Sequence, residues 1–183
     1  MKSYLIDKGF PSINYIVNNW PLTKNTLKKF ILSNHKKPDL YSLTIACMNE
    51  LRIFKINSYK SILLKCSRLC ARNIYYNTYH DQHHFKAVLV ISCILAKHLN
   101  LKYRDRVLLI FIALTHDMNH QGRRILGATP FYQENKSYEG LEKLLFKKVL
   151  NHDQMKRIKK IFQSTYFPIK PENVTDKLEK IIL

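Results

Sequence analysis

The order of apolar and polar residues along the chain predicts helices almost throughout. A period of two, which marks half-buried β-strands, is nearly absent, and glycine occurs only four times. Apolar residues instead recur at helical spacing, most clearly in residues 84–99 and 104–115. We therefore expect an all-α fold built as a multi-helix bundle.

The first part of the chain predicts four helices joined by polar segments, at residues 11–20, 23–32, 38–54 and 58–70. Thr23 and Ser58 are suitable N-caps for the second and the fourth. In the fourth helix, the residues expected to face inward are Ile62, Leu63, Cys66, Leu69 and Cys70. A polar and aromatic joint then leads into a histidine-rich stretch.

Two strongly apolar segments form the middle of the chain. One face of the first carries a stripe that we expect to point into the core: His84, Val88, Ile91, Leu95 and Leu99. The second is apolar on nearly all sides from Val107 to Leu114, which predicts a central helix covered all round.

The last part of the chain predicts a break, a loop and three more helices. Gly122 should break the second apolar helix, and residues 123–132 should form a loop. Helices are expected at residues 137–150 and 153–164, and a last one should begin at Val174.

The composition indicates a folded domain with a core of its own. The chain has 183 residues, 46% of them apolar, and its longest apolar run is far too short to span a membrane. No signal-peptide core is present at the N-terminus, and the four cysteines form no CxxC pair. These features favour the cytoplasm, with no membrane association.

The formal net charge of +18 permits two interpretations. A basic surface could recruit nucleic acid, anionic lipid or a phosphorylated substrate. An AT-rich coding bias would also raise lysine, together with Asn, Ile, Tyr and Phe. Because the lysines are scattered rather than gathered in one arm, we favour a solvated surface without specific nucleic-acid binding.

Two polar clusters, residues 79–84 and 116–122, flank the two apolar segments. Together they hold five of the eight histidines. An isolated histidine on a helix is usually structural, as expected for His35, His98 and His152. His84, in contrast, leads an apolar stripe, and burying it unpaired would cost free energy.

The second cluster, His116 and Asp117, directly follows an apolar helix, where an isolated carboxylate would be costlier still. A divalent metal would satisfy these groups and His84 together. Adjacent helical residues point about 100° apart, so His116 and Asp117 suit one ion, or two ions bridged by the carboxylate. His120, one turn beyond His116, suits a place beside the ligands, holding water on the metal.

The order of these residues resembles a known superfamily. Tyr79 and His80 followed by His84, and then His116-Asp117-x-x-His120-x-Gly122, resemble the HD superfamily. The match within it is to the catalytic domain of 3′,5′-cyclic nucleotide phosphodiesterases. It covers roughly residues 63–183, which we expect to be the metal-site core of a single domain, with 1–62 as an N-terminal helical part.

The resemblance implies a phosphodiesterase-like helical bundle that hydrolyses a small nucleotide phosphodiester with divalent metal ions (Zn, Mg or Mn). It makes His84, His116 and Asp117 metal ligands, with Asp117 bridging two ions. It also implies three further roles: His80 as general acid, His120 as a neighbour of the ligands, and Glu139 as an acid that contacts water on the metal.

The chain also departs from the family pattern. Asp81 replaces an Asn, Ile125 stands near another Asn, and a His-His pair after Glu139 is absent. The family's last ligand, an aspartate on a later helix, has no counterpart before the chain ends at Leu183.

Two explanations of the missing aspartate are open: truncation of the chain, which we favour, or replacement by Asp153 or Asp176. The alternative function is therefore a catalytically weak or inactive remnant, or a regulatory binding domain. A basic nucleic-acid-binding module is a third.

Overall fold

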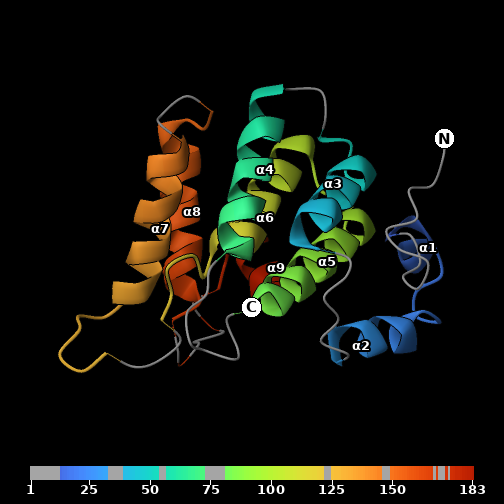
Figure 1. Cartoon of the computed structure of the whole chain (residues 1–183), viewed down its shortest axis with the longest axis horizontal. Helices are drawn as coiled ribbons and strands as arrows, with labels where there is room; N and C mark the ends of the chain where they lie inside the picture. The colour runs from blue at the N-terminus through green and yellow to red at the C-terminus, as the bar shows by residue number, and fades with distance from the viewer. Residues whose placement is uncertain are drawn as a thin grey trace.

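A computed structural model describes residues 13–32, 39–53, 57–72, 81–121, 125–145, 149–166, 168, 172 and 174–183. Every regular element in these ranges is a helix, so the predicted all-α class is confirmed (Figure 1). The helices are α1 (Ile13–Asn18), α2 (Lys24–Leu32), α3 (Leu40–Glu50), α4 (Asn57–Ala71), α5 (Gln82–His98), α6 (Tyr103–Thr115), α7 (Tyr132–Leu145), α8 (His152–Ser164) and α9 (Glu179–Ile182).

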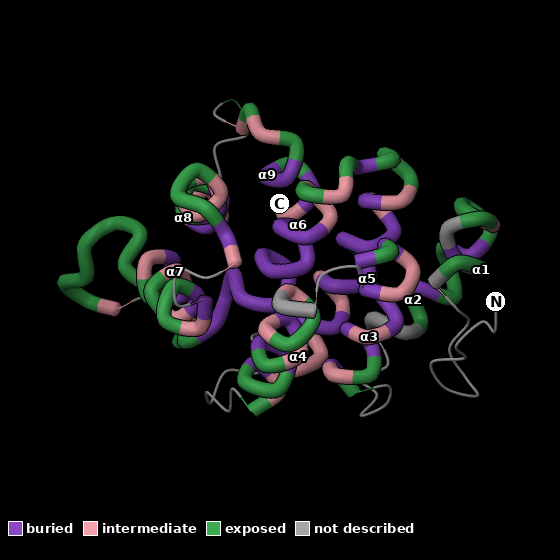
Figure 2. Tube along the Cα trace, turned by 90° about the horizontal axis from the view of Figure 1, so that it is seen from above, coloured by how far each residue is buried: buried purple, intermediate pink, exposed green. Residues whose placement is uncertain are grey.

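Helix α6 forms the centre of the bundle. Every residue from Val107 to Thr115 is buried, and the helix packs against α5, α4, α8 and α7. Figure 2 shows α6 in the middle of the bundle, partly exposed in its first turn and buried along the rest of its length. The prediction of a central helix covered all round is therefore confirmed, because an apolar circumference can only be stable with neighbours on every side.

The predicted inward stripe of α5 is wrong in its register. Ile91 and Leu99 are exposed, whereas Phe85, Leu89 and Cys93 are fully buried. Helix α5 packs on α3 and α6 together, so its buried arc is wide and is centred about one residue further along. Since the consecutive residues 87–91 are all apolar, spacing alone does not determine the centre of the buried arc.

The predicted inward position of Leu69 on α4 is also wrong, because its side chain is exposed. Leu63, Cys66 and Cys70 are buried as expected. All four cysteines of the chain are buried free thiols. Within the described ranges, no helix combines the length and hydropathy that crossing a membrane requires.

Side-chain caps fix the starts of three helices. Asp39 begins α3 and accepts a hydrogen bond from the Ser42 amide at 2.7 Å. Asp81 begins α5 in the same way. Asn151 and Gln154 form a reciprocal capping box at the start of α8.

Two helix starts differ from the prediction. Helix α7 begins at Tyr132, five residues before the expected Ser137, because the stretch after Pro130 already has helical spacing. Helix α9 begins at Glu179 rather than near Val174. The intervening residues instead form a turn in which the buried Glu179 carboxylate accepts hydrogen bonds from the Thr175 and Asp176 amides.

Candidate metal centre

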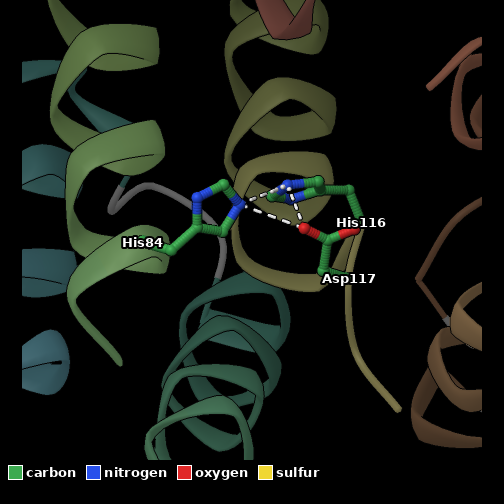
Figure 3. A group of neighbouring side chains, drawn as sticks. All are labelled: His84, His116 and Asp117. Carbon is green, nitrogen blue, oxygen red and sulfur yellow. Dashed lines mark hydrogen bonds and ion pairs between the residues drawn. The ribbon is translucent and has the colours of Figure 1, made fainter. Parts of the chain in front are cut away.

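Helices α5 and α6 bring two histidines and an aspartate together at one point. His84 lies in the first turn of α5, and His116 and Asp117 follow the last turn of α6. Figure 3 shows both imidazoles and the carboxylate pointing toward one another. His84 Nε2 and His116 Nε2 are 3.2 Å apart, and each lies 3.0 Å from Asp117 Oδ2.

The cap of α5 holds His84 in place. Asp81 accepts a hydrogen bond from the His84 amide at 2.9 Å, which satisfies one of the free N–H groups of the first turn. Aspartate and asparagine are equally good N-caps. Asp81, where the phosphodiesterase pattern has asparagine, is therefore an equally good N-cap for the helix that carries His84.

A tight turn positions the other two donors, and we call residues 116–121 the metal turn. The His116 amide still donates to Ile112 as in a helix, and the His120 amide donates to the Asp117 carbonyl at 3.0 Å. Asn119 then takes a positive φ of 66°, a conformation that asparagine adopts more readily than most residues. Helix α6 thus ends before Gly122, the predicted break, which lies outside the described residues.

The donor set fits a divalent metal. Divalent ions bind imidazole nitrogen and carboxylate oxygen at about 2.0–2.2 Å, so ligand atoms lie about 3.0 Å apart around an octahedral ion and about 3.4 Å apart around a tetrahedral one. The three observed separations have this size. Without an ion, two imidazole nitrogens and one oxygen would have to share protons within the same triangle, whereas an ion satisfies all three lone pairs together.

The electrostatics of His116 favour a proton when no metal is bound. Burial alone would lower the pKa of His116, but the charge of Asp117, the hydrogen bond to it and nearby backbone carbonyls outweigh burial and raise that pKa. His116 Nδ1 is buried and has no hydrogen-bond partner among the described residues. A metal must therefore displace a proton from this imidazole.

His120 lies within electrostatic reach of the same three residues. Burial lowers its pKa, the charge of Asp117 partly offsets this, and His116 and His84 lower the pKa further. The half-buried imidazole is therefore predominantly neutral at pH 7. A neutral imidazole beside the donors can accept a proton or orient water.

The structure does not bring every predicted residue to the centre. Glu139 lies on the exposed side of α7 and pairs with Lys136 at 2.9 Å. That hydrogen bond is the main reason why the pKa of Glu139 is lowered. His80, the predicted general acid, lies outside the described residues.

Neither of the proposed replacements for the missing aspartate joins the three donors. Asp176 is held by Arg157 through hydrogen bonds of 2.6 and 2.9 Å, and Asp153 is exposed in the first turn of α8. Within the described ranges, the ligand atoms close enough together to hold a metal ion are those of His84, His116 and Asp117.

One acid near the centre was not anticipated from the sequence. Glu134 is buried in the first turn of α7, and burial, together with the charge of Asp117, raises its pKa although a backbone hydrogen bond partly offsets this. It was missed because the helix was expected to begin at Ser137. The available signal was Pro130, since a proline followed by an acidic residue in a first turn is typical of a helix start.

Comparisons of the chain with models of known protein families, with curated proteins and with solved structures gave no match.

Proposed function

We propose that the protein is a metal-dependent phosphohydrolase that resembles the 3′,5′-cyclic nucleotide phosphodiesterases and cleaves a small nucleotide phosphodiester. The observation that supports this most is the convergence of His84, His116 and Asp117 within 3.0–3.2 Å. Burying His116 and Asp117 at the end of an apolar helix, beside the half-buried His84, is costly without an ion. Such a group is well suited to hold zinc, magnesium or manganese.

The three donors would hold the ion, and Asp117 could bridge to a second. When bound, a divalent ion neutralises the charge of the phosphodiester and activates water as a nucleophile. The neutral imidazole of His120 would orient that water beside the donors. His80 would protonate the departing oxygen, a role proposed from the resemblance alone.

A second candidate is a metal-binding domain of the same type without turnover. It is favoured by the position of Glu139, which faces solvent and pairs with Lys136. Only three donors gather within the described ranges, which leaves the ion with fewer protein ligands than the resemblance implies. In this case, the domain would bind a nucleotide or a partner as a regulatory unit.

Specific nucleic-acid binding is not part of the proposal. Exposed lysines lie on α2, α7 and α8, and Lys136 on α7 is offset by Glu139. A dispersed charge of this kind increases solubility more than it defines a binding face.

Elemental analysis of protein purified without chelator tests the proposal first. We expect at least one zinc, manganese or similar ion per chain, lost in an Asp117→Asn, His116→Ala double variant. An exposed-site control, Asp153→Asn, should keep the metal. Wild-type protein that binds no divalent ion would contradict both candidates.

Hydrolysis then distinguishes the two candidates. The assay uses cyclic AMP, cyclic GMP and an aryl phosphodiester with added Mn²⁺ or Mg²⁺. Turnover that is abolished by chelator and by Asp117→Asn supports the phosphohydrolase. Stoichiometric metal without turnover on any of these substrates supports the regulatory domain.

A further inference from the structure

The first turn of α7 places a second acid beside the metal centre. Glu134 is only 6% exposed. It begins the buried face of α7, which continues through Ser137, Leu141 and Leu145. Positions spaced by three and four residues lie on one side of a helix, so Glu134 lies on the same side as Ser137.

That side of α7 packs on the metal turn. The Ser137 hydroxyl donates a hydrogen bond to the Met118 carbonyl at 2.8 Å. The side-chain oxygen of Gln133 accepts one from the Gln121 amide at 2.8 Å. Glu134 lies between these two contacts, and its buried position therefore faces the turn rather than solvent.

The packing of α7 on the metal turn is close as well as hydrogen-bonded. A Cβ atom added at Gly140 would lie 2.6 Å from Met118 Cε and 2.9 Å from Asn119 Nδ2. The glycine lets α7 approach the turn along the face that Glu134 begins. Helix α7 thus holds the backbone of Glu134 at a fixed place relative to the metal turn.

Charge around Glu134 points to a cation. No lysine or arginine in the described part of the chain pairs with this carboxyl, although the protein has 31 basic residues and only 13 acidic ones. The charge of Asp117 acts on Glu134, so two acids lie near each other in a buried region. A buried carboxylate without a cation is costly.

We propose that Glu134 is the fourth protein ligand of the metal centre, an inference that rests on the metal site of the proposed function. Two carboxylates and two neutral imidazoles balance the charge of one divalent ion. Glu134 is not one of the three donors whose ligand atoms lie within 4.8 Å of one another. The rotatable side chain of glutamate allows its carboxylate to turn onto the ion when the ion is bound.

The proposal is tested by titrating Co²⁺ into the metal-free protein, with visible absorption reporting coordination and calorimetry reporting affinity. Glu134→Gln keeps the shape of the side chain and removes its charge. We expect it to weaken Co²⁺ binding by about 10–100-fold or more and to change the Co²⁺ spectrum. Glu139→Gln, on the exposed face of the same helix, should change neither.

Each other outcome is decisive. Unchanged affinity and spectrum in Glu134→Gln would overturn the fourth ligand and leave the three-donor site intact. Weaker binding with an unchanged spectrum would also overturn it, because the carboxylate would then act without contacting the ion. Absence of Co²⁺ binding in the wild type would contradict the metal site itself.

In chelator, neither variant should unfold at a lower temperature than the wild type, which excludes a folding defect as the cause. If Glu134→Gln does not fold, Glu134→Asp provides the second test. It keeps a carboxylate ligand and should retain the wild-type Co²⁺ spectrum at reduced affinity. A Co²⁺ spectrum of Glu134→Asp that differs from the wild-type spectrum at saturating Co²⁺ would overturn the proposal.

Discussion

At the residue scale, a proton and the proposed metal would compete for the imidazole of His116. His116 is buried against Asp117, whose charge raises the histidine pKa despite the opposing effect of burial. In the metal-free protein this histidine therefore keeps its proton to a higher pH than an ordinary histidine. Metal binding releases that proton, so acid disfavours the loaded centre.

We predict that metal affinity falls as the pH is lowered, beginning above the ordinary histidine pKa of about 6.5. The decrease should approach about tenfold per pH unit for each proton displaced. Calorimetric titration of Zn²⁺ between pH 6 and pH 8, with buffers of different ionisation enthalpy, measures both the affinity and the proton release. Affinity independent of pH over this range would contradict protonation of His116.

At the scale of single elements, the N-cap of α5 couples helix stability to the metal centre. Asp81 binds the amide of His84, which is itself a donor of the site. The same carboxylate also raises the pKa of the buried Lys86, opposing the larger effect of burial, which lowers that pKa. Asp81 thus has two separable contributions, a hydrogen bond and a charge.

We predict that Asp81→Ala lowers the free energy of unfolding by about 1 kcal/mol, the usual value of an N-cap, and weakens metal binding. Asp81→Asn should retain both properties, because asparagine caps as well as aspartate. Urea unfolding and Zn²⁺ titration of the two variants provide the comparison. Equal losses in both would show that the charge near Lys86 matters more than the cap.

At the scale of the whole molecule, one arginine joins the end of the chain to the central helix. Arg157 of α8 binds Asp176 with two hydrogen bonds and Asp105 of α6 with a third at 2.6 Å. Its side chain is 32% exposed, so solvent screens part of the interaction. The network holds α6, α8 and the segment before α9 together without contributing to the three gathered donors.

We predict that Arg157→Met lowers the free energy of unfolding by about 1–2 kcal/mol, since two paired carboxylates lose their charged donor. Metal affinity should stay unchanged. Lys160→Met on the same helix is the control, because Lys160 is 61% exposed and lies 3.8 Å from Glu179. A similar loss in both variants would indicate a general effect of charge rather than the network.

The same network predicts a pH dependence. Arg157 lowers the pKa of Asp176, so the stability from this pair is present above the ordinary aspartate pKa of about 3.9. It is lost as the pH falls through the lower pKa of the folded state. The difference in stability between wild type and Arg157→Met should therefore shrink in acid, which unfolding at pH 7 and at pH 3 measures.

The net charge of +18 acts on the molecule as a whole. We predict that any binding to DNA or RNA is independent of sequence and falls steeply with salt, because it depends on the release of counterions from phosphates. Fluorescence anisotropy with unrelated oligonucleotides between 50 mM and 200 mM salt tests this. Tight, salt-resistant binding to one sequence would indicate a dedicated interface.

What the sequence determined by itself is local in its physical origin. Helical spacing and the lack of strand patterns predicted the all-α fold, and the uniformly apolar segment from Val107 to Leu114 predicted the covered α6. The donor chemistry of His84, His116 and Asp117 also follows from residue type and position, and the structure brings the three together. Their role as metal ligands stays a prediction.

Tertiary structure decided whatever depends on neighbours distant in the chain. The buried arc of α5 is set by its simultaneous packing on α3 and α6, which spacing within one helix does not encode. Packing against distant parts of the chain also determines which acid of α7 is buried. Glu134 is buried and Glu139 is exposed, because the docking of Ser137 and Gly140 on the metal turn fixes the rotation of the helix.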